Sequence, residues 1–304
     1  MKCAYPVILE KGRAVGCGQC VNCRLNKRRE WTNRIMLEST LYEDNAFVTL
    51  SYDEKNHPKD GSVSKEELQN FLKRLRARMD YYAEKEGTEP RKVRYFGVGE
   101  YGSKSLRPHY HLILFDYPSC IYRLSQYGKR RASCCAVCDT IRDVWGRGHV
   151  FLGEVSFQSA AYVAGYVVKG WTRDVPEHIA HLDPEFTLKS NRPGIGHDFA
   201  WELASSLLFA EATHVPFSVR HNGRLWPLGR YIRSKVAEFT GGLELEKAPL
   251  DQRVHELSEV IYNDTEVLPK QKTWKVREAL IAPRYHKAKA LEKKLDKSRK
   301  DHLI

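Results

Sequence analysis

Hydrophobic positions repeat with two different periods along the first half of the chain. Short runs of β-branched and aromatic residues at 45–52 and 109–115 predict strands. Apolar residues at 68–79 recur three and four positions apart behind a capping pair, Ser64 and Glu67, and predict a helix. Further strands are predicted at 92–102 and 150–157, and further helices at 24–39, 159–170, 197–209 and 223–239.

The order of these elements limits the possible folds. A short loop containing Gly102 and Pro108 joins the strands at 92–102 and 109–115, so we expect an antiparallel hairpin and not a βαβ crossover. The sequence therefore predicts an α+β fold, in which helices pack on one face of a central antiparallel sheet. The stretch from 116 to about 148 is expected to be irregular, and 184–196 to be a turn-rich loop.

Changes in composition divide the chain into four regions. We expect a cysteine-rich element with a basic helix at 1–40, the sheet and its helices at 41–175, and a helical and loop extension at 176–265. A basic tail fills 266–304, and from Lys270 onward it has 12 Lys and Arg against four acidic residues. Such a charge run is more often a solvated face than a nucleic-acid-binding arm.

Charge indicates the class of partner. The 304 residues include 50 Lys and Arg against 38 Asp and Glu, a formal net charge of +12, which favours a polyanion such as nucleic acid. Aromatic residues make up 11% of the chain and offer surfaces on which bases stack. No apolar run approaches the roughly 20 residues of a membrane span, and the first residues lack a signal-peptide pattern. We therefore expect a cytoplasmic protein without membrane contact.

Two histidines stand one residue apart in an apolar strand. His109 and His111 project to the same face, so both imidazoles can bind one metal ion, although the pattern also fits two packed core histidines. Glu100 ends the preceding strand of the predicted hairpin and is the expected third ligand; the alternative for it is an ordinary strand-end position. Two imidazoles and a carboxylate suit Mn²⁺ or Mg²⁺ acting on a phosphate.

Three polar side chains share one face of the helix predicted at 159–170, which Ser159 is expected to cap. Tyr162 and Tyr166 are four residues apart, and Lys169 follows three residues later. Two tyrosines at this spacing are more often packing residues. The other interpretation is a nucleophilic tyrosine, since a phenol with an ordinary pKa of about 10 attacks more readily beside a cation such as Lys169.

The eight cysteines fall into two groups. The first group consists of Cys3, Cys17, Cys20 and Cys23. Its CxxCxxC run suggests a tetrahedral zinc site, with an iron–sulfur cluster as a weaker alternative and free thiols as the simplest one. Four basic residues follow directly, so a zinc site here would stiffen a DNA-binding helix: Arg24, Lys27, Arg28 and Arg29. The second group, for which metal binding is left open, consists of Cys120, Cys134, Cys135 and Cys138.

Several separate motifs together resemble one known family. The segments "FVTLSY", "RPHYHLILF" and "YVAGYVVKG" occur in the order of the three motifs of HUH rolling-circle replication initiators. The flanking text "CGQCVNCRLNKRREWTNRIMLE", "VRYFGVGEYGSKSLRPHYHLILF" and "PEFTLKSNRPGIG" is similar to the replication initiators of gokushovirus-type microviruses, which are small single-stranded DNA phages. The resemblance covers roughly residues 1–240.

The resemblance implies a fold and a reaction. The fold is a sheet of the ferredoxin or RNA-recognition-motif type, with His109 and His111 on a middle strand. The reaction is a metal-assisted attack by a tyrosine on a single-stranded origin, which leaves a 5′-phosphotyrosine and a free 3′-OH. Tyr162 and Tyr166 fit alternating roles in nicking and rejoining, and Tyr166 ranks slightly first because it forms a tyrosine-x-x-lysine pattern with Lys169.

The same resemblance implies partners and leaves alternatives. The partners are the origin strand, attached covalently during the reaction, and the replication helicase and polymerase of a bacterial host, in whose cytoplasm the protein would act. Thr49 and Tyr52 of the first motif are expected to be scaffold residues. The alternatives are a non-catalytic single-stranded nucleic-acid-binding or packaging protein, which leaves the histidines and tyrosines unexplained, and a related HUH transposase or relaxase, which lacks the microvirus-like flanks.

Overall fold

The computed structural model describes residues 3, 5–8, 14–102, 105–122, 134–169, 181–221, 223–246 and 290. The chain divides into two compact units, one of residues 31–202 and one of residues 1–30 with 203–304. Apart from residue 290, the predicted basic tail lies outside the described residues. Among the described helices, none has the length and apolar character needed to cross a membrane.

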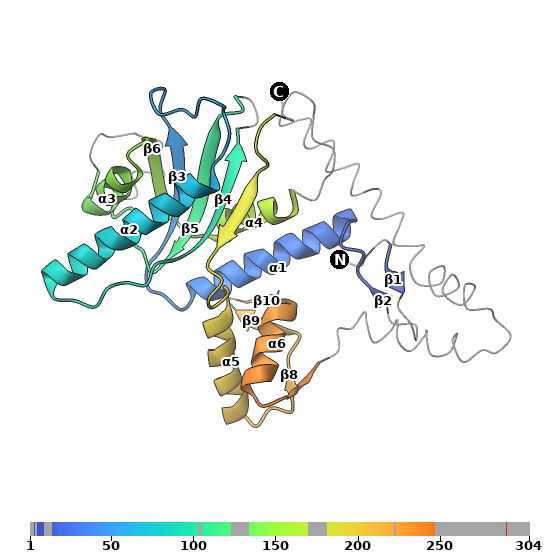
Figure 1. Ribbon diagram of the computed structural model, residues 1–304. Coiled ribbons are helices and arrows are strands. Elements are labelled where there is room, and N and C mark those ends of the chain that lie inside the picture. The colour runs from blue at the N-terminus through green and yellow to red at the C-terminus, as the bar shows by residue number, and fades with distance from the viewer. Residues whose placement is uncertain are drawn as a thin grey trace. The chain divides into compact units, whose positions relative to one another are not determined.

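A five-stranded antiparallel sheet forms the centre of the unit of residues 31–202 (Figure 1). The strands are β3 (Asn45–Tyr52), β4 (Arg94–Tyr101), β5 (Pro108–Phe115), β6 (Gly148–Glu154) and β7 (Phe186–Lys189). Their order is β6-β3-β5-β4-β7, so β5 is the middle strand. The predicted α+β fold with an antiparallel sheet is confirmed, and β4 and β5 form the predicted hairpin.

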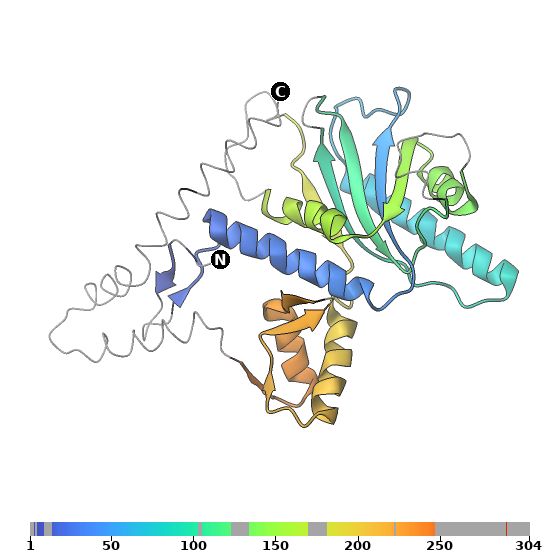
Figure 2. The same ribbon diagram turned by 180° about the vertical axis from the view of Figure 1, so that it is seen from behind.

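Helices cover both faces of this sheet. Helices α2 (Lys65–Glu86) and α3 (Ala136–Trp145) lie on one face, and α4 (Phe157–Lys169) lies on the other (Figures 1 and 2). The end of α1 (Val21–Ser39) packs on the same face as α4. The prediction that helices cover one face is therefore wrong. The physical reason is the unbroken apolar run at the end of β5, which presents hydrophobic side chains to both sides.

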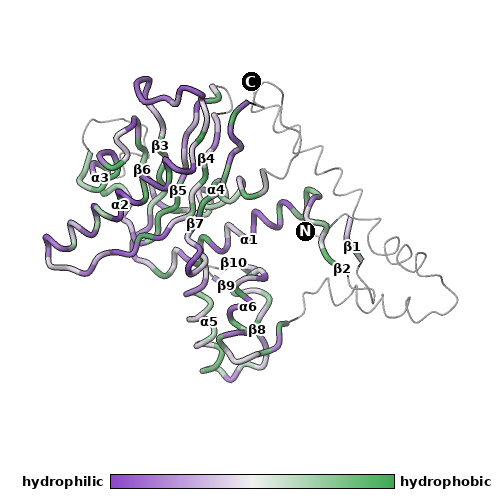
Figure 3. The backbone as a smooth tube through the Cα atoms, viewed as in Figure 1, coloured by the Kyte–Doolittle hydropathy of each residue, from purple (hydrophilic) through white to green (hydrophobic). Residues whose placement is uncertain are grey.

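The side chains of β5 alternate between two cores. Tyr110, Leu112 and Leu114 pack with α2 and α3, whereas Ile113 and Phe115 pack with α1 and α4. His109 and His111 have the same parity as the second set, so they stand on the α4 face. Figure 3 shows the matching pattern in hydropathy, with hydrophobic residues concentrated in the central strands.

Helix α2 begins and ends as its sequence predicts. The Ser64 hydroxyl accepts a hydrogen bond from the Glu67 amide at 3.2 Å, and Gly87 ends the helix in the left-handed conformation with φ 65°. Its stripe of buried residues, Leu68, Phe71, Leu72 and Leu75, packs on the sheet. Local capping and helical spacing therefore fix this element without help from the rest of the fold.

Four elements differ from the sequence predictions. Helix α3 lies in the stretch expected to be irregular, and β7 lies in the expected loop at 184–196. Helix α4 begins at Phe157, because Ser156 and not Ser159 is its cap: the Ser159 amide donates to the Ser156 hydroxyl at 3.1 Å. Strand β10 (Arg224–Pro227) replaces the first part of the helix predicted at 223–239, since it pairs with β9 (Ser218–His221).

The other unit has a small core of its own. Its first part contains the short pair β1 (Val7–Ile8) and β2 (Ala14–Val15) and the start of α1. Its second part contains the end of α5 (His197–Phe209), then β8 (His214–Val215), β9, β10, α6 (Gly229–Phe239) and β11 (Glu244–Leu245). The buried side chains of this second part are Val215, Trp226, Leu228, Ile232 and Val236.

Candidate metal and tyrosine site

Strand register brings the three predicted metal ligands together. Glu100 of β4 pairs directly with His109 of β5, and His111 follows on the same face. The Glu100 Oε1 atom lies 3.1 Å from His109 Nε2 and 2.9 Å from His111 Nε2. The Glu100 side chain is only 2% exposed, so this carboxylate is enclosed by its neighbours and is not an ordinary strand-end residue.

Hydrogen bonds at the far side of each imidazole orient the two rings. His109 Nδ1 lies 3.1 Å from the Arg107 carbonyl oxygen, and His111 Nδ1 lies 2.8 Å from the Thr49 hydroxyl. When Nδ1 carries the hydrogen in both rings, these contacts leave both Nε2 lone pairs directed at the Glu100 carboxylate. Metal-binding histidines are typically held in this way. Thr49, which the sequence indicated only as scaffold, therefore positions His111; its place beside His111 depends on the pairing of β3 with β5.

The charges of the site are strongly coupled. Burial alone would raise the pKa of Glu100, but hydrogen bonds with His109, His111 and Tyr162 outweigh it and lower the pKa to about 2. Burial likewise acts to lower the pKa of His109, yet the hydrogen bond with Glu100 raises it above the ordinary value. Without a cation, a proton on an imidazole thus compensates the buried carboxylate.

Helix α4 presents the two tyrosines at unequal depth. The Tyr162 hydroxyl donates to Glu100 Oε1 at 2.8 Å and lies 3.5 Å from His111 Nε2. The Tyr166 hydroxyl donates to the Tyr162 hydroxyl at 3.2 Å, one step further from the carboxylate. Burial and the contact with Glu100 raise the pKa of Tyr162, so its hydroxyl is protonated at neutral pH. Lys169 is the last residue of α4.

The donor set fits a metal ion. The ligand atoms of Glu100, His109 and His111 all lie within 4.8 Å of one another. They approach from one side, and Tyr162 closes part of the remaining space. A cleft of ≈ 690 Å³ opens beside His109, and Lys55, Arg107 and His149 are among its lining residues. A phosphate-bearing ligand entering this cleft would therefore meet basic side chains on its way to the candidate metal site.

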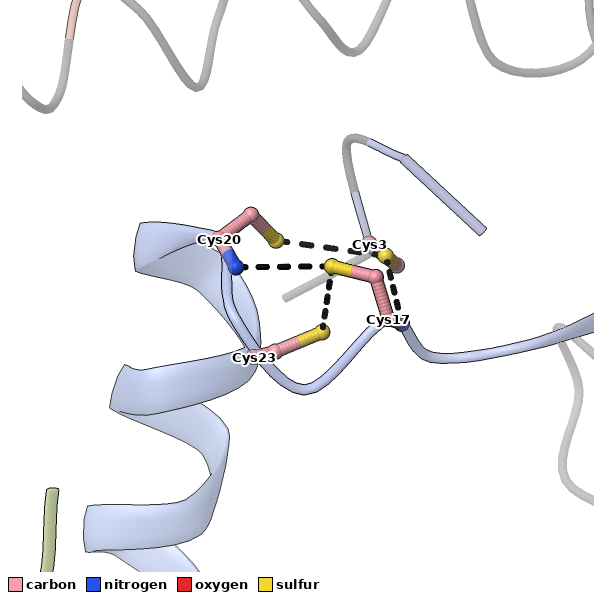
Figure 4. Close-up of side chains that lie close together, drawn as sticks. All are labelled: Cys3, Cys17, Cys20 and Cys23. Atoms are coloured by element: carbon pink, nitrogen blue, oxygen red, sulfur yellow. Dashed lines mark hydrogen bonds between the residues drawn. The ribbon is translucent and has the colours of Figure 1, made fainter. Parts of the chain in front are cut away.

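The first cysteine group also converges (Figure 4). Two pairs of sulfur atoms have measured separations: Cys3 Sγ lies 3.9 Å from Cys20 Sγ, and Cys17 Sγ lies 4.0 Å from Cys23 Sγ. Backbone amides support the sulfur atoms, since Cys17 N donates to Cys3 Sγ at 3.3 Å and Cys20 N donates to Cys17 Sγ at 3.4 Å. Amide donors of this kind stabilise negative charge on sulfur. All four thiols are free, so the arrangement does not depend on a disulfide.

The predicted basic cluster follows the cysteines on the first turns of α1. It consists of Arg24, Lys27, Arg28 and Arg29. Lys27 forms an ion pair with Glu30 at 3.1 Å, whereas Arg29 is exposed. The structure therefore distributes these four side chains around the helix start and does not gather them into one site.

The fold and the site define a class of protein, the replication-associated proteins of small phages. Residues 45–171, which include Glu100, both histidines and both tyrosines, match the family model of the replication-associated protein ORF2. This match and the relatives below confirm the resemblance found in the sequence motifs.

Three particular relatives are similar to about half of the chain. Replication-associated protein VP4 of Bdellovibrio phage phiMH2K is 35% identical over 156 residues, 51% of this chain and 48% of the relative. Replication-associated protein ORF2 of Spiroplasma virus 4 is 32% identical over 164 residues, 51% and 48% of the two chains. Replication-associated protein ORF4 of Chlamydia phage 1 is 30% identical over 156 residues, 50% and 37%. The match thus spans about half or less of each relative's length, and no solved structure matches the chain.

Proposed function

We propose that this protein initiates phage DNA replication by nicking a single strand at an origin, as an HUH endonuclease and strand transferase. The observation that carries the proposal is the Tyr162 hydroxyl at 2.8 Å from the carboxylate of a Glu-His-His set, inside the segment that matches phage replication-associated proteins. The middle position of β5 in the sheet supports an HUH-type fold for this core. In this proposal residues 41–175 are the endonuclease region.

Glu100, His109 and His111 would hold Mn²⁺ or Mg²⁺, and the two imidazoles favour Mn²⁺. When bound, such an ion supplies Lewis-acid polarisation of the scissile phosphate. The protein's own contribution is the fixed geometry: Thr49 and the Arg107 carbonyl hold the rings, and the buried carboxylate needs no reorganisation when charge develops.

Tyr162 is the first nucleophile in this proposal, ahead of Tyr166. Its oxygen forms a bond to phosphorus while the bond from phosphorus to the 3′ oxygen breaks. The phenolic proton passes to Glu100, the acceptor of its hydrogen bond, and from there to water, and the departing 3′ oxygen takes a proton from water. The products are a 5′-phosphotyrosine and a free 3′-OH, which primes synthesis.

Tyr166 completes the cycle. After one round of synthesis it attacks the regenerated origin, and the new 3′-OH displaces Tyr162 from its phosphodiester, which closes the released strand into a circle. The separation of 3.2 Å between the two hydroxyl oxygens supports this alternation, because one scissile phosphate bound beside Glu100 lies within reach of both. A cation at Lys169 would favour ionisation of either phenol.

The N-terminal cysteines fit a structural role in the same protein. We propose that Cys3, Cys17, Cys20 and Cys23 hold Zn²⁺. In a tetrahedral thiolate site with bonds of about 2.3 Å, neighbouring sulfur atoms are about 3.8 Å apart, close to the 3.9 and 4.0 Å separations of this cluster. Such a site would stiffen the basic start of α1 for contact with DNA. The proposed setting is the cytoplasm of a bacterial host, with its replication helicase and polymerase as partners.

Formation of a covalent adduct tests the nicking proposal. The full chain is incubated with Mn²⁺ and single-stranded oligonucleotides that together cover the phage genome, and is then denatured. We expect one oligonucleotide to remain attached to the protein, and the attachment to disappear in the Tyr162→Phe, Tyr166→Phe double variant but not in Tyr42→Phe, a half-buried tyrosine away from the site. Binding of DNA without an adduct for every oligonucleotide and metal would instead establish the non-catalytic binding protein.

A further inference from the structure

A second four-cysteine cluster lies within the unit of residues 31–202. The sulfur atoms of Cys120, Cys134, Cys135 and Cys138 all lie within 4.8 Å of one another, and Cys120 Sγ is 3.5 Å from Cys134 Sγ. All four residues are free thiols. Because sulfur atoms around one tetrahedral zinc ion are about 3.8 Å apart, small side-chain adjustments would suffice to enclose an ion.

The four side chains come from two segments that are separate along the chain. Cys120 lies in the loop that follows β5, while Cys134 and Cys135 precede α3 and Cys138 lies in its first turn. Cys135 is the N-cap residue of α3, a position that usually holds an oxygen-bearing side chain, and it makes no side-chain capping bond. The amides of the first helical turn favour thiolate charge at this end of α3.

Ordinary hydrophobic packing is the alternative for these residues. Free cysteines behave as small apolar side chains, and Cys120, Cys135 and Cys138 do belong to the large core beneath α2 and α3. Packing alone, however, does not require four residues of one type to converge on one point. All eight cysteines of the chain belong to the two four-cysteine clusters, so none occupies an unrelated core position.

The location of α3 shows what such a site would stabilise. Trp145 at the end of α3 packs against Tyr110 with ring centroids 5.7 Å apart, and its Nε1 donates to the Ser51 carbonyl at 3.1 Å. Tyr110 stands between His109 and His111 on β5 and faces the opposite side of the sheet. Helix α3 thus supports the back of the strand whose front carries both imidazoles.

We infer that Cys120, Cys134, Cys135 and Cys138 bind a structural zinc ion that fastens the start of α3 to the loop leaving β5. A closed set of four thiolates leaves no open coordination position, so the site is structural and not catalytic. The ion joins two segments that are 14 residues apart at Cys120 and Cys134, and thereby holds α3 against the sheet.

Zinc content of the full chain tests this inference independently of nicking. All proteins carry His109→Ala, which prevents zinc from occupying the Glu-His-His set, and bound metal is measured by mass spectrometry after dialysis. We expect Cys138→Ser and Cys17→Ser each to lower the zinc content by one ion per chain, and the double variant to lower it by two. Val144→Ala, which removes buried volume from the same helix without touching a thiol, should retain all zinc.

Thiol labelling keeps the test decisive if Cys138→Ser does not fold. In the unsubstituted chain, we expect alkylation of the four cysteines of this cluster to be at least tenfold slower before zinc removal than after it. Equal labelling rates before and after removal would overturn the inference, as would a folded Cys138→Ser variant with unchanged zinc content. Neither result depends on DNA cleavage, so failure of this site and failure of the nicking proposal are distinguishable.

Discussion

The unequal depth of the two tyrosines leads to a prediction about the order of cleavage. Tyr162→Phe removes the oxygen that donates to Glu100 at 2.8 Å, whereas Tyr166→Phe removes only the outer hydroxyl at 3.2 Å from Tyr162. Both substitutions keep the aromatic ring. The pair therefore compares two nearly isosteric changes, of which only the first alters the immediate surroundings of the carboxylate.

The contacts give the size of the expected effects. A hydrogen bond to a charged group contributes about 1.5–3 kcal/mol when buried. Tyr162 is 42% exposed, so solvent screening reduces the expected loss of stability in Tyr162→Phe to about 1 kcal/mol. For Tyr166→Phe we expect only a few tenths of a kcal/mol. Loss of the first nucleophile should lower the rate of adduct formation at least about 10³-fold, which is about 4 kcal/mol in the activation barrier.

Single-turnover assays separate the two cleavage events. One oligonucleotide carries a single origin site and reports the first adduct, and another carries two sites and reports transfer and rejoining. We expect Tyr166→Phe to form the first adduct at close to the unsubstituted rate but to release no rejoined product, and Tyr162→Phe to fail in both assays. Thermal melting of both variants controls for folding.

Two results would refute the proposed order. If Tyr162→Phe still forms the first adduct while Tyr166→Phe does not, Tyr166 attacks first, as the tyrosine-x-x-lysine pattern suggested. If each single variant retains about half of the adduct, the tyrosines are interchangeable and the difference in depth has no catalytic meaning.

Three further predictions concern the ligands and the sheet. Thr49→Val should lower Mn²⁺ affinity about 10–100-fold in titration calorimetry, because His111 loses its orienting partner. In chelator, the lowered pKa of Glu100, about 2 against the ordinary 4.5, should stabilise the fold by about 3 kcal/mol above pH 4.5, and this is lost as the pH falls through 2; an equal loss in Glu100→Gln during denaturant unfolding would contradict it. Gly148→Ala should destabilise by about 3 kcal/mol or more, since φ is 148° and the new Cβ would overlap the Asp53 amide nitrogen and the Ser51 carbonyl oxygen; unchanged urea unfolding would count against this.

The parts of the site that the sequence predicted depend on short-range geometry. Alternation along β5 places His109 and His111 on one face, and a short hairpin places Glu100 opposite His109, so a local pattern suffices for all three. The same holds for α2, whose cap and apolar stripe lie within the helix itself. These features need no knowledge of the order of strands in the sheet.

The missed features depend on contacts between distant segments. Thr49 reaches His111 only because β3 lies beside β5, and β7 becomes a strand only because β4 offers it a free edge. Helix α3 has an apolar repeat at Val137, Ile141 and Val144, but cysteines and an irregular approach obscure it in the sequence. The relative depth of the tyrosines follows from how α4 lies on the sheet, which helical spacing alone does not specify.

The hairpin between β4 and β5 acts as a ruler for the metal site. The Gly102 amide donates to the Arg107 carbonyl at 3.0 Å, and this contact sets the register that pairs Glu100 with His109. A slip of one residue would turn the carboxylate toward α2 and leave the imidazoles on the opposite side of the sheet. The spacing between these two strands is thus part of the site, and a comparison of such replication proteins can use the length of this turn, and not only its ligands, to recognise chains able to bind the same ion.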